Sequence, residues 1–109
     1  MMNDTLQSLY QVVCDRRENP QEGSYTCYLF SKGVDKILKK CGEECAEVII
    51  AAKGNDNHET VMELSDLLYH LTVLMVDRGI PLEDVMHELD QRSRKIGNLK
   101  QFHTVDHDS

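Results

Sequence analysis

Five carboxylates in one part of the sequence have the types and spacing of a metal site. They form two groups, Glu43, Glu44 and Glu47 in the first, and Glu63 and Asp66 in the second. Residues three apart share one face if their segment is helical. Hard divalent cations prefer such oxygen ligands, and Mg²⁺ in particular combines carboxylates with waters and substrate phosphates. The pattern predicts inward-facing carboxylates that hold Mg²⁺, and the competing interpretation is a solvated helix face.

The net charge of the chain is concentrated around these groups. The 109 residues include 12 basic and 19 acidic residues, which gives a formal net charge of −7. Seven of the acidic residues lie within residues 43–66, where Lys53 is the only Lys or Arg, so this window alone carries −6. No polybasic stretch elsewhere would suit DNA or an anionic membrane. We therefore expect neither nucleic-acid nor membrane partners.

The apolar periodicity predicts an all-α fold, a bundle of about four helices, in which two long helices position the carboxylates. The expected helices cover residues 5–17, 34–53, 57–78 and 81–97. Gly54 and Gly79 end the second and third helices, and Asp56 with Glu59 resembles a capping box at the start of the third. Residues 1–97 are thus expected to form one domain, followed by a mobile tail over residues 98–109.

The third helix contains the run LLYHLTVLMV, which is apolar almost all round. Such a helix in a small protein is expected at the centre of a bundle or against another subunit. The same helix carries Glu63, Asp66 and His70 on one face. Because neutral imidazole is a poor Mg²⁺ ligand, we expect His70 to support the site or to fill the core.

Residues 21–33 have no clear period and are predicted to form a loop. Its hydroxyl-bearing residues Ser24, Tyr25 and Thr26 make it suitable for ligand contacts. The four cysteines are predicted to be reduced thiols, with Cys41 and Cys45 on a core face. The start of the sequence lacks the features of a signal peptide, and no apolar run is long enough for a membrane span. A soluble cytoplasmic protein is expected.

Other chemistries lack their motifs. Di-iron bundles need Glu-x-x-His pairs on two helices, and the sequence has none. Zinc motifs, a P-loop and a Gly-x-Gly-x-x-Gly loop are also absent. Phosphates would therefore be held by metal and lysine rather than by a glycine-rich loop.

The two carboxylate groups also carry a family resemblance. Glu43-Glu44-x-x-Glu47 followed by Glu63-x-x-Asp66 resembles the metal-binding signature of the all-α, MazG-type nucleoside triphosphate pyrophosphatases. The surrounding segments DRRENPQEGSYTCYLFSKGVDKILKKCGEECAEVIIAAK and ELSDLLYHLTVLMVDRGIPLEDVMHEL are similar to the phosphoribosyl-ATP pyrophosphatase family. The resemblance implies Mg²⁺-dependent hydrolysis of phosphoribosyl-ATP to phosphoribosyl-AMP and pyrophosphate, a step of histidine biosynthesis.

The resemblance also implies roles for individual residues. It makes Glu44, Glu47, Glu63 and Asp66 the metal ligands, and Glu43 a further ligand or a base that orients water. The catalytic residues would then be Glu43, Glu44 and Glu47. The implied substrate-binding residues are Lys36, Lys40, Arg16, Ser24, Tyr25 and Thr26. A homo-oligomer, a dimer or an assembly of dimers, is implied because the family builds its sites between subunits.

Two other functions remain open on the sequence alone. One is a house-cleaning pyrophosphatase of the same superfamily that acts on damaged or surplus nucleoside triphosphates. The other is a non-catalytic helical interaction module whose acidic faces are only solvated or bind a partner's cations. Substrate preference separates the first of these from the expected enzyme, and release of pyrophosphate separates the second.

Overall fold

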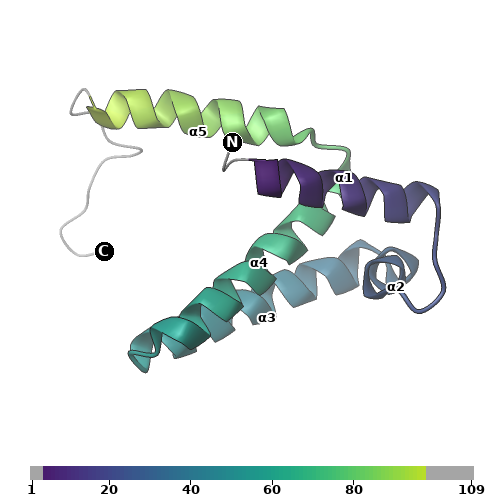
Figure 1. The fold of residues 1–109 in the computed structure, drawn as a ribbon, viewed down its shortest axis with the longest axis horizontal. Coiled ribbons are helices and arrows are strands. Elements are labelled where there is room, and N and C mark those ends of the chain that lie inside the picture. Colours follow the sequence, from purple (N-terminus) through teal and green to yellow (C-terminus); the bar gives the residue numbers. More distant parts are fainter. Residues whose placement is uncertain (1–3, 98–109) are drawn as a thin grey trace.

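The computed structural model of the chain describes residues 4–97, and all regular structure in that range is helical, which confirms the all-α prediction. The helices are α1 (Asp4–Glu18), α2 (Tyr25–Lys32), α3 (Val34–Lys53), α4 (Asn57–Arg78) and α5 (Leu82–Gly97) (Figure 1). None of these helices is both long and apolar enough to cross a membrane. The tail predicted over residues 98–109 lies outside the described residues.

The two long helices begin and end where their capping residues predict. The ranges predicted for the second and third helices match α3 and α4 to the residue. The Asp56 carboxylate accepts a hydrogen bond from the Glu59 backbone N–H at 3.0 Å, which satisfies a free donor at the start of α4. At the other end, Gly79 adopts a left-handed conformation with a φ of 71°, which favours glycine.

The prediction of a loop over residues 21–33 was wrong, because α2 lies inside it and makes five helices rather than four. The Ser24 hydroxyl caps this helix by accepting a hydrogen bond from the Cys27 backbone N–H at 3.2 Å. Leu29 is fully buried on its inner side, and Gly33, with a φ of 98°, separates α2 from α3. Two turns are too short for a helical period to be visible in the sequence.

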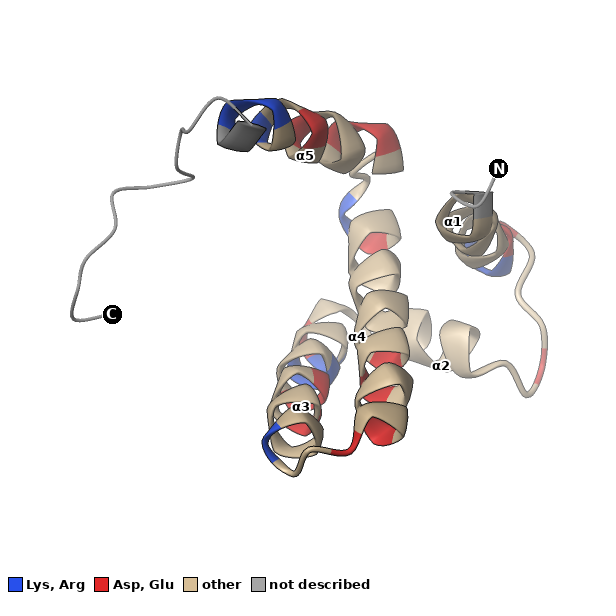
Figure 2. Cartoon of the chain, turned by 60° about the vertical axis from the view of Figure 1, so that its left-hand side comes forward, with Lys and Arg blue, Asp and Glu red and all other residues tan. Residues whose placement is uncertain are grey.

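Helices α3 and α4 lie side by side along their length and form the largest contact in the molecule (Figures 1 and 2). Their short connection makes them antiparallel neighbours. Helix α1 packs against α4, and α2 packs against both α1 and α3. In Figure 2, α5 stands apart from the α3–α4 pair. The pair thus carries the two groups of acidic residues on neighbouring helices.

A small core forms where the first four helices meet. It is built from Val13 of α1, Leu29 of α2, Ile37 of α3, and Val73 and Val76 of α4. All five side chains are at most 5% exposed. Burying side chains of this size contributes roughly 1.5–3 kcal/mol each to the free energy of folding. The core thus fixes α2 against the other helices.

The two α3 cysteines do not share an environment. Cys41 lies in the core, as predicted, but Cys45 is exposed, so the prediction for Cys45 was wrong. Four helical residues turn by about 40° more than a full circle, which carries Cys45 off the narrow buried stripe. All four cysteines are free thiols, as predicted.

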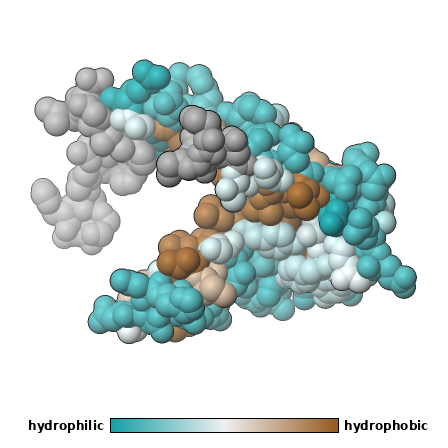
Figure 3. All heavy atoms as spheres, viewed as in Figure 1, coloured by the Kyte–Doolittle hydropathy of each residue, from teal (hydrophilic) through white to brown (hydrophobic). Residues whose placement is uncertain are grey.

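Only one half of α4 is buried. His70, Thr72, Val73 and Val76, in the C-terminal half, are buried in the described chain. Three exposed apolar residues lie in the N-terminal half, Val61, Met62 and Leu64, and a fourth, Leu68, lies just past the midpoint. Figure 3 shows apolar side chains in a band over α4. The prediction of a central helix thus holds for the C-terminal half within a single chain.

Candidate metal and substrate site

The contact between α3 and α4 brings three of the predicted carboxylates together. Carboxylate oxygens of Glu44 from α3 and of Glu63 and Asp66 from α4 all lie within 4.8 Å of one another. Figure 2 shows acidic segments on both helices where they run side by side. Glu44 and Glu63 are half-buried, whereas Asp66 is exposed, so the cluster is open to solvent on one side. The expectation that all the metal-ligand carboxylates face inward thus does not hold for Asp66.

The electrostatic environment of this cluster favours positive charge. Burial raises the pKa of Glu63 above its usual value, and hydrogen bonding to Glu59 adds to the effect. The charges of Glu47, Asp66 and Glu44 raise the pKa of Glu63 further. A proton or a metal ion would relieve the same repulsion. The cluster therefore has the electrostatics of a cation site.

Two other predicted carboxylates lie at the margin of the cluster. Glu47 is exposed, yet it is near enough for its charge to act on Glu63. Glu43 is also exposed, and its carboxylate oxygens lie 3.3 Å from Lys40 Nζ and 4.0 Å from Lys39 Nζ. The structure thus places Glu47 beside the acidic residues and Glu43 beside the lysines.

The predicted phosphate-binding lysines have different surroundings. Lys40 is half-buried, with Nζ 3.3 Å from Glu43 and 3.7 Å from Glu44. Burial alone would lower the pKa of Lys40, but the hydrogen bond to Glu43 and the nearby negative charges raise it above the usual value. Nζ of Lys36 lies instead 5.9 Å from the ring centroid of Tyr28. Lys40 therefore stays positively charged at the edge of the acidic cluster.

A buried histidine connects the acidic cluster to α2. His70 Nδ1 lies 2.7 Å from the backbone carbonyl oxygen of Asp66, and His70 Nε2 lies 3.0 Å from the hydroxyl oxygen of Tyr25. Burial raises the pKa of Tyr25; the charge of Lys40 partly offsets this, and that of Glu44 adds to it. Tyr25 is thus protonated at neutral pH and lies within the electrostatic reach of the cluster.

The other predicted substrate-binding residues already have partners within the chain. The Ser24 hydroxyl caps α2, and the Thr26 hydroxyl hydrogen bonds with the Tyr69 hydroxyl on α4. Nη1 of Arg16 lies 3.1 Å from the carboxylate of Asp15. These bonds order the segment around α2. Among these three hydroxyls, the Tyr25 hydroxyl differs because it contacts His70. His70 in turn bonds to the main-chain carbonyl of Asp66, a residue of the acidic cluster.

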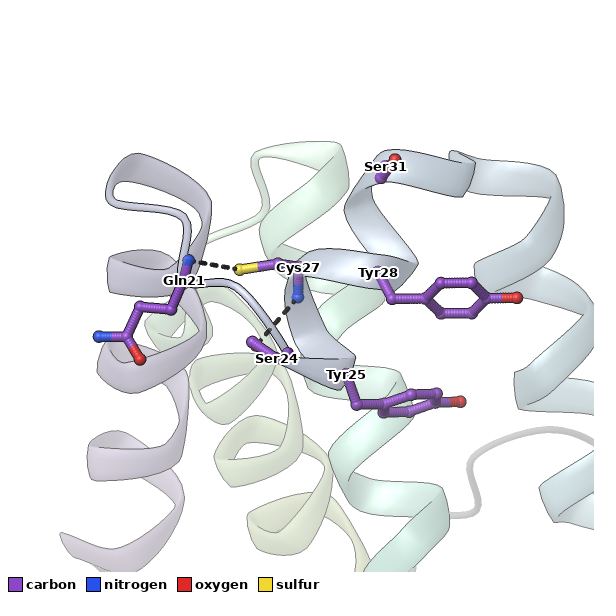
Figure 4. A pocket seen from close by; sticks show the side chains of 7 residues that line it. Gln21, Ser24, Tyr25, Cys27, Tyr28 and Ser31 are labelled. Atoms are coloured by element: carbon purple, nitrogen blue, oxygen red, sulfur yellow. Dashed lines mark hydrogen bonds between the residues drawn. The ribbon is translucent and has the colours of Figure 1, made fainter.

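An open pocket of about 520 Å³ lies at the start of α2. Its lining residues are Gln21, Gly23, Ser24, Tyr25, Cys27, Tyr28 and Ser31. The Tyr25 and Tyr28 rings stack with centroids 6.0 Å apart, and Figure 4 shows both projecting in the same direction. Both rings are partly exposed, a property that suits a planar, partly polar ligand. Tyr25, which also bonds to His70, therefore belongs both to this pocket and to the contact between α2 and α4.

The bond between Tyr25 and His70 could not have been predicted from the sequence. The two residues are 45 positions apart and share no motif spacing. Their meeting depends on α2, which the apolar pattern did not reveal. The position of His70 on the acidic face of α4 did single it out in the sequence, but its partner lies on another helix and could be found only from the fold.

Sequence comparison relates the chain to one family of known proteins. The profile of the family described as phosphoribosyl-ATP pyrophosphohydrolase matches residues 6–93. The chain is 52% identical over 97 residues to a phosphoribosyl-ATP pyrophosphatase of Clostridium novyi, covering 89% of this chain and 88% of the relative. It is 50% identical over 105 residues to the enzyme of that name from Bacillus mycoides, covering 96% and 98%. A Clostridium botulinum relative of the same name is 53% identical over 98 residues, covering 90% and 89%.

Proposed function

Because this chain belongs to the phosphoribosyl-ATP pyrophosphohydrolase family, we propose that Glu44, Glu63 and Asp66, together with Glu47, hold Mg²⁺ for the family's reaction. The chain is a hydrolase that converts phosphoribosyl-ATP to phosphoribosyl-AMP and pyrophosphate in histidine biosynthesis. Family membership favours this activity over a house-cleaning pyrophosphatase and over a non-catalytic module. The metal assignment rests on one observation, the approach of three carboxylates from two helices to within 4.8 Å.

The donor set fits Mg²⁺. All the clustered ligand atoms are carboxylate oxygens, which hard cations prefer, and the set contains no thiolate or imidazole that would favour a softer metal. Burial and the neighbouring negative charges both raise the pKa of Glu63, so added positive charge would stabilise its carboxylate. A bound Mg²⁺ would supply it, and would neutralise charge on the phosphate oxygens and make a water molecule more acidic.

The surrounding residues would then position the substrate. Lys40, charged and adjacent to Glu44, would contact the triphosphate, and Lys36 would extend this contact along α3. Glu43, held by Lys40, would orient the attacking water or accept its proton. The residues proposed to contact the phosphoribosyl end are Arg16, Ser24, Tyr25 and Thr26. The stacked tyrosines beside the cluster support this arrangement, since they border an open pocket.

Variants of the three clustered carboxylates test the metal assignment. We expect Glu44→Gln, Glu63→Gln and Asp66→Asn each to lower the Mg²⁺ affinity, and to reduce turnover of phosphoribosyl-ATP by on the order of 100-fold or more. Calorimetric Mg²⁺ titration and pyrophosphate release are the measurements. Glu88→Gln is the matched control, because Glu88 pairs with Arg92 on the exposed surface of α5. Unchanged Mg²⁺ affinity in all three variants would show that the cluster is only a solvated face.

We also propose that the enzyme works as a homo-oligomer built from dimers. Val61, Leu64 and Leu68 are exposed at spacings of three and four, so they form one apolar stripe along α4. Ile49 and Ile50 of the adjacent helix α3 are more than 60% exposed. A second copy of the chain would bury these side chains and remove apolar surface from water.

A cytoplasmic location is proposed for this enzyme. All four cysteines are free, and thiols persist in reducing compartments. Biosynthesis of a small molecule such as histidine also fits that setting. The proposal predicts full activity in the presence of millimolar reductant.

A further inference from the structure

Tyr25 and His70 form a hydrogen-bonded pair behind the acidic cluster. We propose that His70 is a positioning residue that fixes the Tyr25 hydroxyl as a hydrogen-bond acceptor, so that Tyr25 binds a ribose hydroxyl of the substrate and not a phosphate oxygen. This inference rests on the proposed function, in which Tyr25 contacts the substrate. It goes further by assigning a role to His70 and a chemical class to the group that Tyr25 binds.

The direction of the first hydrogen bond follows from the atoms involved, and for a neutral imidazole so does the direction of the second. A backbone carbonyl can only accept, so His70 Nδ1 must carry a proton and donate it to the Asp66 carbonyl oxygen at 2.7 Å. In the neutral imidazole, Nε2 then has no proton and can only accept. The Tyr25 hydroxyl, 3.0 Å from Nε2, therefore donates its single proton to His70. What remains on the Tyr25 oxygen is its capacity to accept.

Burial makes this arrangement persistent. His70 is only 5% exposed, so breaking its bond to Tyr25 would leave a buried polar atom unsatisfied. Ring contacts fix the orientation as well, because the Tyr25 ring meets His70 edge-on with centroids 5.7 Å apart and stacks on Tyr69 at 6.1 Å. The hydroxyl proton of Tyr25 thus points towards the buried His70.

The outer side of Tyr25 is accessible to a ligand. The residue is 44% exposed and lines the open pocket at the start of α2. The charges of Lys40 and Glu44 both act on the pKa of its hydroxyl, so the oxygen lies within their electrostatic reach. We therefore expect a ligand held at the cluster to reach the Tyr25 oxygen.

The Tyr25 oxygen can then bind only a ligand group that donates a hydrogen bond. Ionised phosphate oxygens only accept, so they cannot bind to an oxygen whose one proton is already donated. A ribose hydroxyl can donate, and the proposed substrate carries ribose next to each of its phosphate-bearing ends. We therefore assign Tyr25 to a ribose hydroxyl and leave the phosphates to metal and lysine.

Two substitutions of His70 test the roles of its two ring nitrogens separately. In His70→Asn the amide can replace Nδ1 and donate to the Asp66 carbonyl, but it is too short to reach Tyr25. In His70→Gln the longer amide places an acceptor oxygen near the position of Nε2. We expect His70→Asn and Tyr25→Phe each to lower kcat/KM by about three- to tenfold, the factor that one neutral hydrogen bond supplies. His70→Gln should retain most of the activity.

A double-mutant cycle decides whether His70 acts through Tyr25. In the Tyr25→Phe background, His70→Asn should cause no further loss of kcat/KM, because the bond is already gone. Tyr69→Phe is the control, since it removes another hydroxyl that joins α2 to α4 without bonding to His70. Its effect on kcat/KM should be the same in both backgrounds, and circular dichroism should show that all variants are folded.

The possible results are distinguishable. Independent, multiplicative losses for His70→Asn and Tyr25→Phe would overturn the positioning role, as would a His70→Gln variant no better than His70→Asn. Full activity of Tyr25→Phe would overturn both this inference and the substrate role proposed for Tyr25. The metal assignment would not be affected by that result, because the carboxylate variants test it separately.

Discussion

At the scale of single residues, Glu63 is the carboxylate whose pKa is raised within the acidic cluster. Burial is the first cause, followed by the hydrogen bond to Glu59 and by the neighbouring negative charges. A raised pKa means that the folded chain binds this proton more tightly than the unfolded chain does. The stability contributed by the proton is complete below the unfolded pKa and is lost as the pH rises through the folded pKa. The metal-free protein should therefore lose stability through this group as the pH rises from about 4 through the raised pKa of Glu63.

A Glu63→Gln variant tests the predicted direction of this change in stability with pH. Without metal, we expect its Tm to exceed that of the unmodified chain at pH 7 and the difference to vanish near pH 4, where the carboxyl is protonated. Saturating Mg²⁺ should reverse the order at pH 7, because only the unmodified cluster gains stability from the ion. Glu88→Gln is the control with the opposite sign, since Arg92 lowers the pKa of Glu88. A lower metal-free Tm for Glu63→Gln at pH 7 would contradict the argument.

The sequence predicts the chemistry of the site better than its geometry. Carboxylates at spacings of three identify Glu44, Glu63 and Asp66, because spacing within a helix directly decides which side chains share a face. The pairing of Tyr25 with His70 joins two helices, so it depends on tertiary packing that no local pattern encodes. Residues on one element are thus predictable, whereas contacts between elements are not.

At the scale of elements, length decides which helices the sequence reveals. Helices α3 and α4 have 20 and 22 residues, long enough for the apolar period to repeat and for capping residues to mark the ends. Helix α2 has eight residues, which would not form a stable helix in isolation. It is held by its cap and by the burial of Leu29. The fold class was therefore predictable, but the helix that carries Tyr25 was not.

The cap of α2 gives a prediction at this scale. Ser24→Ala removes the acceptor for the Cys27 backbone N–H and should lower the free energy of unfolding by about 1 kcal/mol. Ser24→Asp keeps an acceptor at the same position and should preserve most of the stability. Urea denaturation followed by circular dichroism measures both. Equal stability of Ser24→Ala and the unmodified chain would show that tertiary contacts alone hold α2.

At the scale of the whole molecule, the exposed stripe of α4 predicts association. Leu68, 51% exposed, lies on the face that a second copy is proposed to cover. We expect Leu68→Glu to lower the mass seen by sedimentation velocity, because a charge would be buried without a partner. Val12→Glu on α1 is the control, since Val12 is similarly exposed, at 48%, but lies on another helix.

Either of two results would contradict this assignment. If the unmodified chain sediments as a monomer at micromolar concentration, there is no assembly for the stripe to support. If Val12→Glu dissociates the assembly and Leu68→Glu does not, the interface lies elsewhere. Activity measured on the same samples would show whether association is needed for turnover.

Asp66 takes part in the site through two chemically independent groups. Its side chain belongs to the acidic cluster, whereas its main-chain carbonyl orients His70 and, through it, Tyr25. Replacing the side chain leaves the carbonyl in place, so a protein engineer could weaken metal binding and still retain the Tyr25 surface proposed to bind a ribose hydroxyl. An inactive Asp66→Asn enzyme of this kind would be a suitable scaffold for capturing intact substrate in a crystal.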